Sequence, residues 1–511
     1  MSYRARALFR HTRTPAALTV FMAALLLPLS FTGGVVTTPA IQHMLDGSPG
    51  ELSWLTNGFM LTFGSFLLTA GIAADAALGR KPVFIAGAAL FCLSSLIIGV
   101  MNNLIMQGLL RSLQGMAAAM LLASGSALLA GIYEGTERTR MFSLLGTLFG
   151  AGLAFGPLAV GFITDTLGWR WVYILFALLS GGVLLAGRAY LPLSALNASH
   201  PADKAGLTLF TAALILFTTA MMLLPTFGFL SPLPLVLFLC SILFLGAFIV
   251  RCQRIAHPVL DISLLRSPRF AGVLLLPVAT CYCYVVLLII VPLHFMGGNG
   301  FSESRSALFL MALTAPMLVL PACAAVLTRW FSPSVVSASG LMIAAAGLLF
   351  LGQALQGHST LLLIVALLIT GAGAALPWGL MDGLALSAVP VEKAGMAAGL
   401  FNTVRVAGEG IALAMVSAFL IRINDMNLSK TVQGLTSAEI HQAAAWLGGG
   451  NLKQALTLLP GVSRVVVQNS YDSAYLYLFR VLAAITLCCA LAVLALSGQP
   501  RRENTFSEES E

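Results

Sequence analysis

Two charged residues lie one helical turn apart in an otherwise apolar stretch, GLFNTVRVAGEGIALAM (399–415): they are Arg405 and Glu409. Side chains four residues apart share a helix face and can interact. A lone charge at the centre of a membrane helix costs about 2.5–3.5 kcal/mol on insertion scales. Two interpretations follow. Either the two charges form a structural ion pair, or Glu409 carries a proton whose binding frees Arg405 for a substrate or another helix.

The composition indicates that this stretch crosses a membrane. The chain has 511 residues, of which 59% are hydrophobic and only 9% charged, too few charges to cover a soluble protein of this length. The net charge of +8 comes from basic residues scattered over short loops, which argues against a nucleic-acid-binding face. The eight cysteines contain no CxxC pair and fall in or at the ends of apolar runs, so packing is their expected role.

Apolar runs of about 18–25 residues mark helices long enough to cross a bilayer. Fourteen such runs occur, arranged as six, two and six, and an even number places both termini on the same side. The predicted spans are 15–41, 52–74, 82–101, 104–132, 140–164, 169–190, 206–226, 232–250, 270–295, 305–328, 334–355, 359–388, 394–421 and 476–497. We expect an all-α integral membrane protein in which two six-helix bundles are joined through two inserted helices.

The positions of the basic residues predict the orientation. With the N-terminus inside, 18 of the 27 Lys and Arg residues fall in cytoplasmic segments and two in the short outside loops, as the positive-inside rule requires. The expected segments are a cytoplasmic N-terminus (1–14), a six-helix bundle (15–190), two inserted helices with flanking cytoplasmic loops (191–269), a second six-helix bundle that includes a periplasmic loop at 423–475 (270–497), and an acidic cytoplasmic tail (498–511).

The loop 423–475 is the one sizeable segment predicted outside the bilayer. Thr436 and Glu439 stand at capping-box spacing, and Gly448–Gly450 follow, so a short helix is expected between them. Two roles stay open for it: a cap over the outer opening of a transport path, or an inert linker.

The span LGTLFGAGLAFGPLAVGFITD (145–165) is rich in glycine around one proline. Small residues let helices approach closely, and a proline beside a glycine makes a helix bendable. The motif residues are Gly150, Gly152, Gly156, Pro157 and Gly161. Their spacing is similar to the antiporter signature in the fifth helix of drug:proton antiporters of the major facilitator superfamily.

Three further stretches resemble motifs of the same superfamily. RSLQG (111–115) resembles the fourth-helix motif, whose arginine, here Arg111, is implicated in proton transfer. AGMAAGLFNTVRVAGEGIALAM (394–415) looks like the thirteenth span of the fourteen-span drug:proton antiporters, where an Asn-Thr-x-Arg core recurs. VPLHFMGGNGFSES (291–304) matches the exit of the ninth span.

GIAADAALGRK (71–81) resembles the loop motif between the second and third helices, usually written G-x-L-A-D-R-x-G-R-K. In the family, the aspartate and the basic residues latch the two halves on the cytoplasmic side. The matching residues, expected to form this gate, are Gly71, Asp75, Gly79, Arg80 and Lys81. Ala76 replaces the usual arginine and one residue is inserted before Gly79, which weakens the expected latch.

The resemblance covers nearly the whole chain. It implies two six-helix bundles with the substrate between them near the midplane and alternating access by rocking. The family's first helix usually carries an aspartate nine residues before a proline. Here Ser30 takes that position and Pro39 is kept, so the first span has no acidic residue and is a poor site for cationic drugs.

Proton coupling needs a group that changes its protonation inside the membrane. Among the acidic residues, only Asp382 and Glu409 fall within predicted spans, with Glu409 roughly mid-membrane at 1.5 Å per residue. Asp382 lies nearer the cytoplasmic end, where a helix-end or packing role is the alternative. Arg111 has no acidic partner on its own helix, and a snorkelling or carbonyl-bonded arginine is its alternative. The candidate proton-coupling residues are Glu409, Arg405, Arg111 and Asp382.

Polar, aromatic and sulfur-bearing side chains near the expected midplane cavity are candidates for contact with a hydrophobic ligand. They are Asn402, Gln114, Trp378, Met381 and Tyr284, with plain helix packing as the alternative for each. His294, at the outer end of the ninth span, can titrate near neutrality, with interface packing as its alternative.

The sequence contains no P-loop and no metal-spaced His/Cys cluster, so we expect neither direct use of ATP, nor a cofactor, nor an enzyme. The leading hypothesis is a monomeric, proton-coupled exporter of lipophilic, drug-like or toxic molecules in the bacterial inner membrane. Its partners are the small-molecule substrate, protons and the bilayer, and not nucleic acid. The alternatives are a dedicated exporter of one endogenous metabolite such as a siderophore, and a transport-inactive scaffold or sensor.

Overall fold

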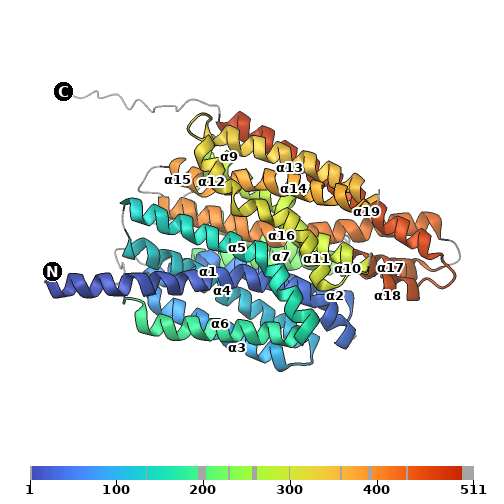
Figure 1. Cartoon of the computed structure of the whole chain (residues 1–511), viewed down its shortest axis with the longest axis horizontal. Coiled ribbons are helices and arrows are strands. Elements are labelled where there is room, and N and C mark those ends of the chain that lie inside the picture. Colours follow the sequence, from blue (N-terminus) through green and yellow to red (C-terminus); the bar gives the residue numbers. More distant parts are fainter. Residues whose placement is uncertain are drawn as a thin grey trace.

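The computed structural model describes residues 3–45, 47–133, 135–193, 203–227, 231–255, 262–298, 300–356, 359–389, 394–432 and 435–497. Within these ranges the regular structure is entirely helical. The long helices lie side by side along one axis, and the start of α1 and the end of α19 lie at the same end of the molecule (Figure 1). The short helices α17 and α18 lie at the opposite end. The predicted tail 498–511 falls outside the described residues.

The N-terminal half contains six long helices and one π-helical turn. They are α1 (Tyr3–Leu45), α2 (Pro49–Ile72), η1 (Ala73–Ala77), α3 (Arg80–Val100), α4 (Leu104–Ile132), α5 (Gly135–Leu167) and α6 (Trp169–Tyr190). Helix α1 packs against α5 and α6, α2 against α4, and α3 against α4 and α6. This half is therefore one closed bundle.

Two inserted helices follow, α7 (Lys204–Phe227) and α8 (Pro232–Arg254), and they pack against each other. Helix α7 also contacts α2 and α16, so it lies along the line where the two halves meet. Helix α8 has a mostly exposed apolar surface that includes Leu239, Ile242 and Leu243. A helix that is apolar on its exposed face is expected where lipid is the solvent.

The C-terminal half is more broken. Its elements are η2 (Ile262–Arg266), α9 (Pro268–Thr280), η3 (Cys281–Val285), α10 (Leu287–Gly297), α11 (Glu303–Thr314), η4 (Ala315–Leu318), α12 (Leu320–Leu327), α13 (Pro333–Gln356), α14 (Thr360–Trp378), α15 (Met381–Ser387), α16 (Ala394–Thr431), α17 (Ser437–Gly448), α18 (Leu452–Thr457) and α19 (Arg464–Ser497). Helix α13 packs against α14 and α19, and α9 against α19.

The described part of the chain contains fourteen helical segments long and apolar enough to cross a membrane, which confirms the predicted number. Three of them, each expected as one helix, are interrupted in the middle. A π-turn separates α9 from α10 just after Pro277, a 3-10 turn containing Pro316 separates α11 from α12, and α14 ends directly after Pro377. Proline lacks the N–H that the i→i−4 ladder needs, so each helix loses its regular pattern near that point.

Two predicted boundaries differ from the structure. Helix α1 already begins at Tyr3, inside the segment 1–14 expected as an N-terminus. Helices α16 and α19 extend into the predicted loop 423–475, so the segment between these long helices runs only from 432 to 463. Polar residues such as Asn424 and Asp472 made these turns resemble loop, but in the structure they are helical and pack against neighbouring helices.

The short helix α17 starts with the predicted capping box. The Thr436 hydroxyl accepts from the Glu439 N–H. The Glu439 carboxylate accepts two hydrogen bonds of 2.8 Å, from the Thr436 N–H and from the Thr436 hydroxyl. These bonds lower the pKa of the Glu439 carboxyl below its usual value. The apolar face of α17, including Ile440, Ala444 and Leu447, is buried and packs against α16.

Removing the cap tests how firmly α17 is held. Thr436→Ala should cost about 1 kcal/mol of local helix stability, the usual value for an N-cap, and so raise amide hydrogen exchange in α17 about fivefold. Thr436→Ser keeps a hydroxyl and should leave exchange close to that of the parent. Equal protection of α17 in Thr436→Ala and the parent would mean that packing on α16 alone holds this helix.

Candidate functional site

A charged network lies inside the N-terminal half. The guanidinium of Arg111 on α4 is fully buried and donates four hydrogen bonds: to the hydroxyl and carbonyl of Ser30, to the Leu55 carbonyl and to the Gln114 side-chain oxygen, at 2.8–3.1 Å. Gln114 in turn donates to the Ser95 hydroxyl at 2.7 Å. Every acceptor is uncharged, so the cation is solvated by hydrogen bonds and not by an anion.

Helix α1 is shaped around this arginine. Ser30, at the position where related first helices carry an aspartate, supplies two of the four acceptors. A Cβ built on Gly34, one turn further along α1, would overlap the guanidinium of Arg111. The Phe59 ring lies 4.7 Å from the Arg111 Cζ, in cation–π contact. Helices α1, α2 and α4 therefore meet around one buried cation.

A second charged cluster belongs to the C-terminal half. The Arg405 Nη1 on α16 lies 3.3 Å from the Asp382 Oδ1 on α15, and these side chains are 12% and 60% exposed. The Arg405 Cζ also lies 5.6 Å from the Trp378 ring and 5.9 Å from the Phe149 ring of α5. The expected i,i+4 ion pair with Glu409 is not among the ion pairs of the described residues, because Arg405 turns toward the residues that follow the break after α14.

Glu409 lies where the two halves meet. It is 8% exposed and borders a cavity of about 10 Å³, room for about one water molecule. The other walls of this cavity are apolar and come from both halves: Leu27, Pro28, Phe31, Met60, Phe63, Phe149, Leu153 and Val285. Within the described part of the chain, the Glu409 side chain makes no hydrogen bond or ion pair, so it differs from Arg111 and Arg405.

The backbones of the two halves touch on either side of Glu409. A Cβ built on Gly64 of α2 would lie 2.6–2.7 Å from backbone atoms of Ala407 on α16. One turn away, a Cβ on Gly410 would lie 3.4 Å from the Met60 Cβ. We call this contact between α2 and α16 the seam. At the depth of Glu409, the two halves are therefore in direct backbone contact.

The predicted cytoplasmic gate residues lie together at the end of α2. The Arg80 Nε lies 2.7 Å from the Asp75 Oδ1, and the Lys81 ammonium donates to the carbonyls of Arg188 and Leu191. The residue inserted before Gly79 is absorbed by the π-helical turn η1, since a π-turn accommodates one extra residue in a helix. Gly79 then reverses the chain at φ 92°. Gly71 lies in the last turn of α2. The role of this group as a gate stays a prediction.

The glycine-rich motif of α5 packs against α1. A Cβ added at Gly152 would meet Pro28, and one added at Gly156 would meet the Thr32 hydroxyl. The other motif residues on α5, all buried, are Gly150, Pro157 and Gly161. The close approach of α1 and α5 follows from these glycines, and it positions the apolar wall of α1 and α5 that faces Glu409.

The residues expected at a midplane substrate cavity are tightly packed in this conformation. Gln114 belongs to the Arg111 network, Met381 is fully buried, and the Tyr284 and Trp378 rings are 5.7 Å apart in an edge contact. Asn402 is partly buried on α16. None of these five belongs to the described lining of the large cavity, so their contact with a substrate stays a prediction for another conformation.

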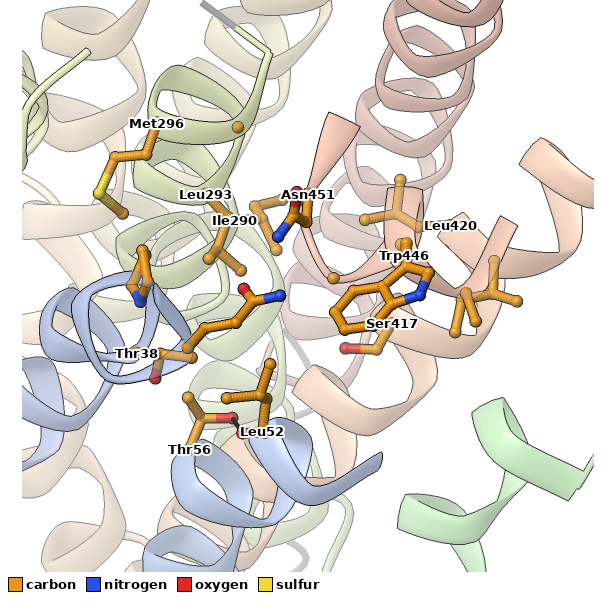
Figure 2. A pocket seen from close by; sticks show the side chains of 18 of the residues that line it. Thr38, Leu52, Thr56, Ile290, Leu293, Met296, Ser417, Leu420, Trp446 and Asn451 are labelled. Carbon is orange, nitrogen blue, oxygen red and sulfur yellow. Dashed lines mark hydrogen bonds between the residues drawn. The ribbon is translucent and has the colours of Figure 1, made fainter. Parts of the chain in front are cut away.

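A large cavity lies instead at the end of the bundle that carries α17 and α18. Its volume is about 720 Å³, within the range of small-molecule sites. Figure 2 shows side chains from both halves around it: Thr38 and Thr56 from α1 and α2 face Ile290, Ser417 and Trp446 from α10, α16 and α17. We call this cavity the vestibule. The sequence did not predict it, because its walls come from six helices, α1, α2, α10, α16, α17 and α18, which belong to both halves of the chain.

A buried acidic residue also escaped the sequence analysis. The Asp472 Oδ1 on α19 lies 3.0 Å from the His294 Nε2 on α10, and both side chains are largely buried. Tyr471 stacks on the imidazole at 5.1 Å, and Gln468 donates to the Asp472 carboxylate. Asp472 had been assigned to the outside loop, but the candidate span Arg464–Leu496 includes it. Two roles had been left open for His294, and in the structure it both packs against Tyr471 and pairs with Asp472.

The sequence was compared with models of known protein families. The sequence model of the Major Facilitator Superfamily matches residues 20–413. The chain belongs to this superfamily.

Several relatives of this chain are named for export, drug resistance or transport. The chain is 26% identical over 504 residues to the tetracenomycin C resistance and export protein of Streptomyces glaucescens, covering 94% of this chain and 91% of the relative. It is 27% identical to a probable actinorhodin transporter of Streptomyces coelicolor (85% and 77% covered) and 24% identical to the multidrug resistance protein Stp of Mycobacterium tuberculosis (75% and 72%). A superfamily transporter with fourteen apolar helices is a multi-pass inner-membrane protein, and not an enzyme.

Solved structures show the same fold. The peptide transporter POT in complex with sulfate superimposes with a TM-score of 0.62 at 14% identity, covering 94% of both chains. A D-xylose–proton symporter superimposes with a TM-score of 0.58 at 14% identity, covering 88% of this chain and 98% of that one. At these identities the likeness concerns the fold alone, and it confirms the predicted fold class.

Gly34→Ala tests the space around Arg111. The new methyl must push the guanidinium off its acceptors or move α1, and overpacking of this kind costs about 1–3 kcal/mol. We expect a lower melting temperature in detergent and weaker transport than in the parent. The loss of transport should equal that of Arg111→Gln, which removes the buried cation itself. Gly246→Ala on α8, where a Cβ would meet nothing within 4 Å, is the matched control and should be neutral. Unchanged melting and transport in Gly34→Ala would show that the network tolerates displacement.

A double-mutant cycle tests the partner of Arg405. Arg405→Gln and Asp382→Asn should couple by about 0.2–1 kcal/mol in unfolding free energy, the range for a partly exposed pair. Arg405→Gln and Glu409→Gln should couple less, because no ion pair joins them. Stronger coupling in the second cycle would restore the i,i+4 pair that the sequence suggested.

Proposed function

We propose that this superfamily member is a proton-coupled exporter of lipophilic small molecules, which works by alternating access. The observation that carries the proposal is Glu409, a carboxyl group without an ion-pair partner among the described residues, in the seam between the two halves. Export is supported by the relative named as a resistance and export protein and by the relative named as a multidrug resistance protein. The positive-inside rule puts α17 and α18, and with them the vestibule, on the periplasmic side.

The position of Glu409 explains how a proton is used. An isolated carboxylate among apolar side chains is costly, so the side chain carries a proton while the seam is closed. When the halves rock apart, water reaches the carboxyl and the proton can leave. Arg405 and Asp382 lie one turn away on the predicted cytoplasmic side, where Asp382 is 60% exposed and can receive it. Substrate and proton then favour opposite conformations of one equilibrium, which is what exchange requires.

Arg111 has a positioning role in this scheme. Its hydrogen bonds tie α1 and α2 to α4, so the wall that faces Glu409 moves with the N-terminal half as one body. The gate residues Asp75, Arg80 and Lys81 hold the cytoplasmic end of the same half. The helices α17 and α18 cover the periplasmic end of the C-terminal half, and we assign them the capping role over the vestibule.

A dedicated exporter of one product remains the second candidate. Two of the relatives are named for a single antibiotic each, tetracenomycin C and actinorhodin. Ser30 in place of an acid in the first helix also removes a feature that suits cationic drugs. A narrow substrate range and a broad one use the same proton site, so the coupling test serves both.

Glu409→Gln should abolish coupling. In proteoliposomes loaded with a pH-sensitive dye, addition of a transported compound should move protons in the parent and not in the variant. Suitable probes are three flat dyes of different charge: alizarin, its sulfonated anion alizarin red S, and the cation ethidium. Glu137→Gln, an exposed glutamate at the start of α5, is the matched control and should behave as the parent. Normal proton movement in Glu409→Gln would remove Glu409 from the mechanism.

A further inference from the structure

The vestibule offers hydrogen-bond donors at several points of its wall. Gln42 on α1 makes no side-chain hydrogen bond within the described part of the chain. Gln442 on α17 is exposed and belongs to the same lining. Asn451 uses its side-chain oxygen to accept from the Gln454 N–H, so its amide nitrogen is left to donate. Figure 2 shows that nitrogen directed into the cavity. Ligand oxygens fit these donors.

The vestibule also has an apolar surface for a flat ligand. Trp446 of α17 lies on one side and Ile290 with Leu293 of α10 on the other (Figure 2). A tryptophan facing aliphatic side chains makes a slot that suits an aromatic ring system, because the indole offers a large rigid surface and little rotamer entropy is lost. The volume of about 720 Å³ accommodates several fused rings.

The charges around the vestibule select against cations. Its described lining contains Lys453, His43 and His441, and no carboxylate. Lys453 makes no ion pair within the described residues. Of the acids outside this lining, Glu51 accepts from the Ser48 N–H and hydroxyl at 2.8–2.9 Å, and Asp425 is paired with Arg422 at 3.2 Å and lies 3.8 Å from the lining residue His441. The described lining itself thus offers a cationic ligand no carboxylate, whereas an anion would meet Lys453.

We propose that the vestibule binds flat, oxygen-rich aromatic compounds that are uncharged or anionic, as the last site that a substrate occupies before release. This assignment rests on the proposed export function, but it concerns a different set of residues from proton coupling. Trp446 and the aliphatic wall of α10 hold the ring system, Gln42 and Asn451 donate to its oxygens, and Lys453 pairs with an acidic group.

Direct binding of the three dyes to full-length protein in nanodiscs tests this assignment without any gradient. Isothermal titration calorimetry, with empty nanodiscs subtracted, should show that alizarin and alizarin red S bind more tightly than ethidium. Lys453→Glu should weaken alizarin red S about tenfold, the effect of one charge-assisted hydrogen bond, and should strengthen ethidium. Lys430→Glu, an exposed lysine at the end of α16 outside the lining, is the matched control and should change neither.

Trp446→Ala should weaken both alizarins, and melting temperatures will show whether this variant is folded. Tighter binding of ethidium than of the alizarins in the parent would overturn the proposal. So would equal binding in the parent, Lys453→Glu and Trp446→Ala, because the dyes would then bind elsewhere. Repeating the titration with Glu409→Gln separates the two proposals: the alizarins should still bind there, whether or not that variant has lost coupling.

Discussion

A charge inside an apolar bundle must be solvated by the protein or neutralised, and the centre of this transporter is arranged around that constraint. Arg111 is solvated by neutral oxygens of α1, α2 and α4. Arg405 is neutralised by Asp382 and covered by two aromatic rings. Glu409 has neither solution within the described residues, and it lies at the contact between the two halves. In the proposed mechanism a proton neutralises this carboxyl group, and a movement of the halves would change its surroundings.

In the proposed mechanism, binding of a proton and binding of a substrate influence each other through the seam. Gly64 and Ala407 bring the backbones of α2 and α16 into direct contact beside Glu409. The vestibule lies toward one end of the molecule, and the exposed carboxylate of Asp382 toward the other. Opening on either side must separate the same two helices. A ligand on one side and a proton at the seam thus act on one shared equilibrium, although they never touch.

Features written in continuous stretches of sequence were predictable. The fourteen spans follow from apolar runs, and the cap of α17 follows from the spacing of Thr436 and Glu439. Features made by distant residues were not. The partner of Arg405 depends on the break after Pro377, which brings α15 back against α16. Asp472 falls in a segment that was predicted as a loop, and its partner, His294, lies far away in the chain.

The charges also separate the two tasks of an exporter in space. A carboxylate in the substrate path would bind cationic compounds and protons at the same place, so the two would compete directly. Here the first helix carries Ser30 instead of an acid, and the described lining of the vestibule has none. The carboxyl that can carry protons is enclosed by apolar side chains at the seam. Under the proposed function, coupling then has to pass through the conformation of the halves, and the substrate can be neutral or negative.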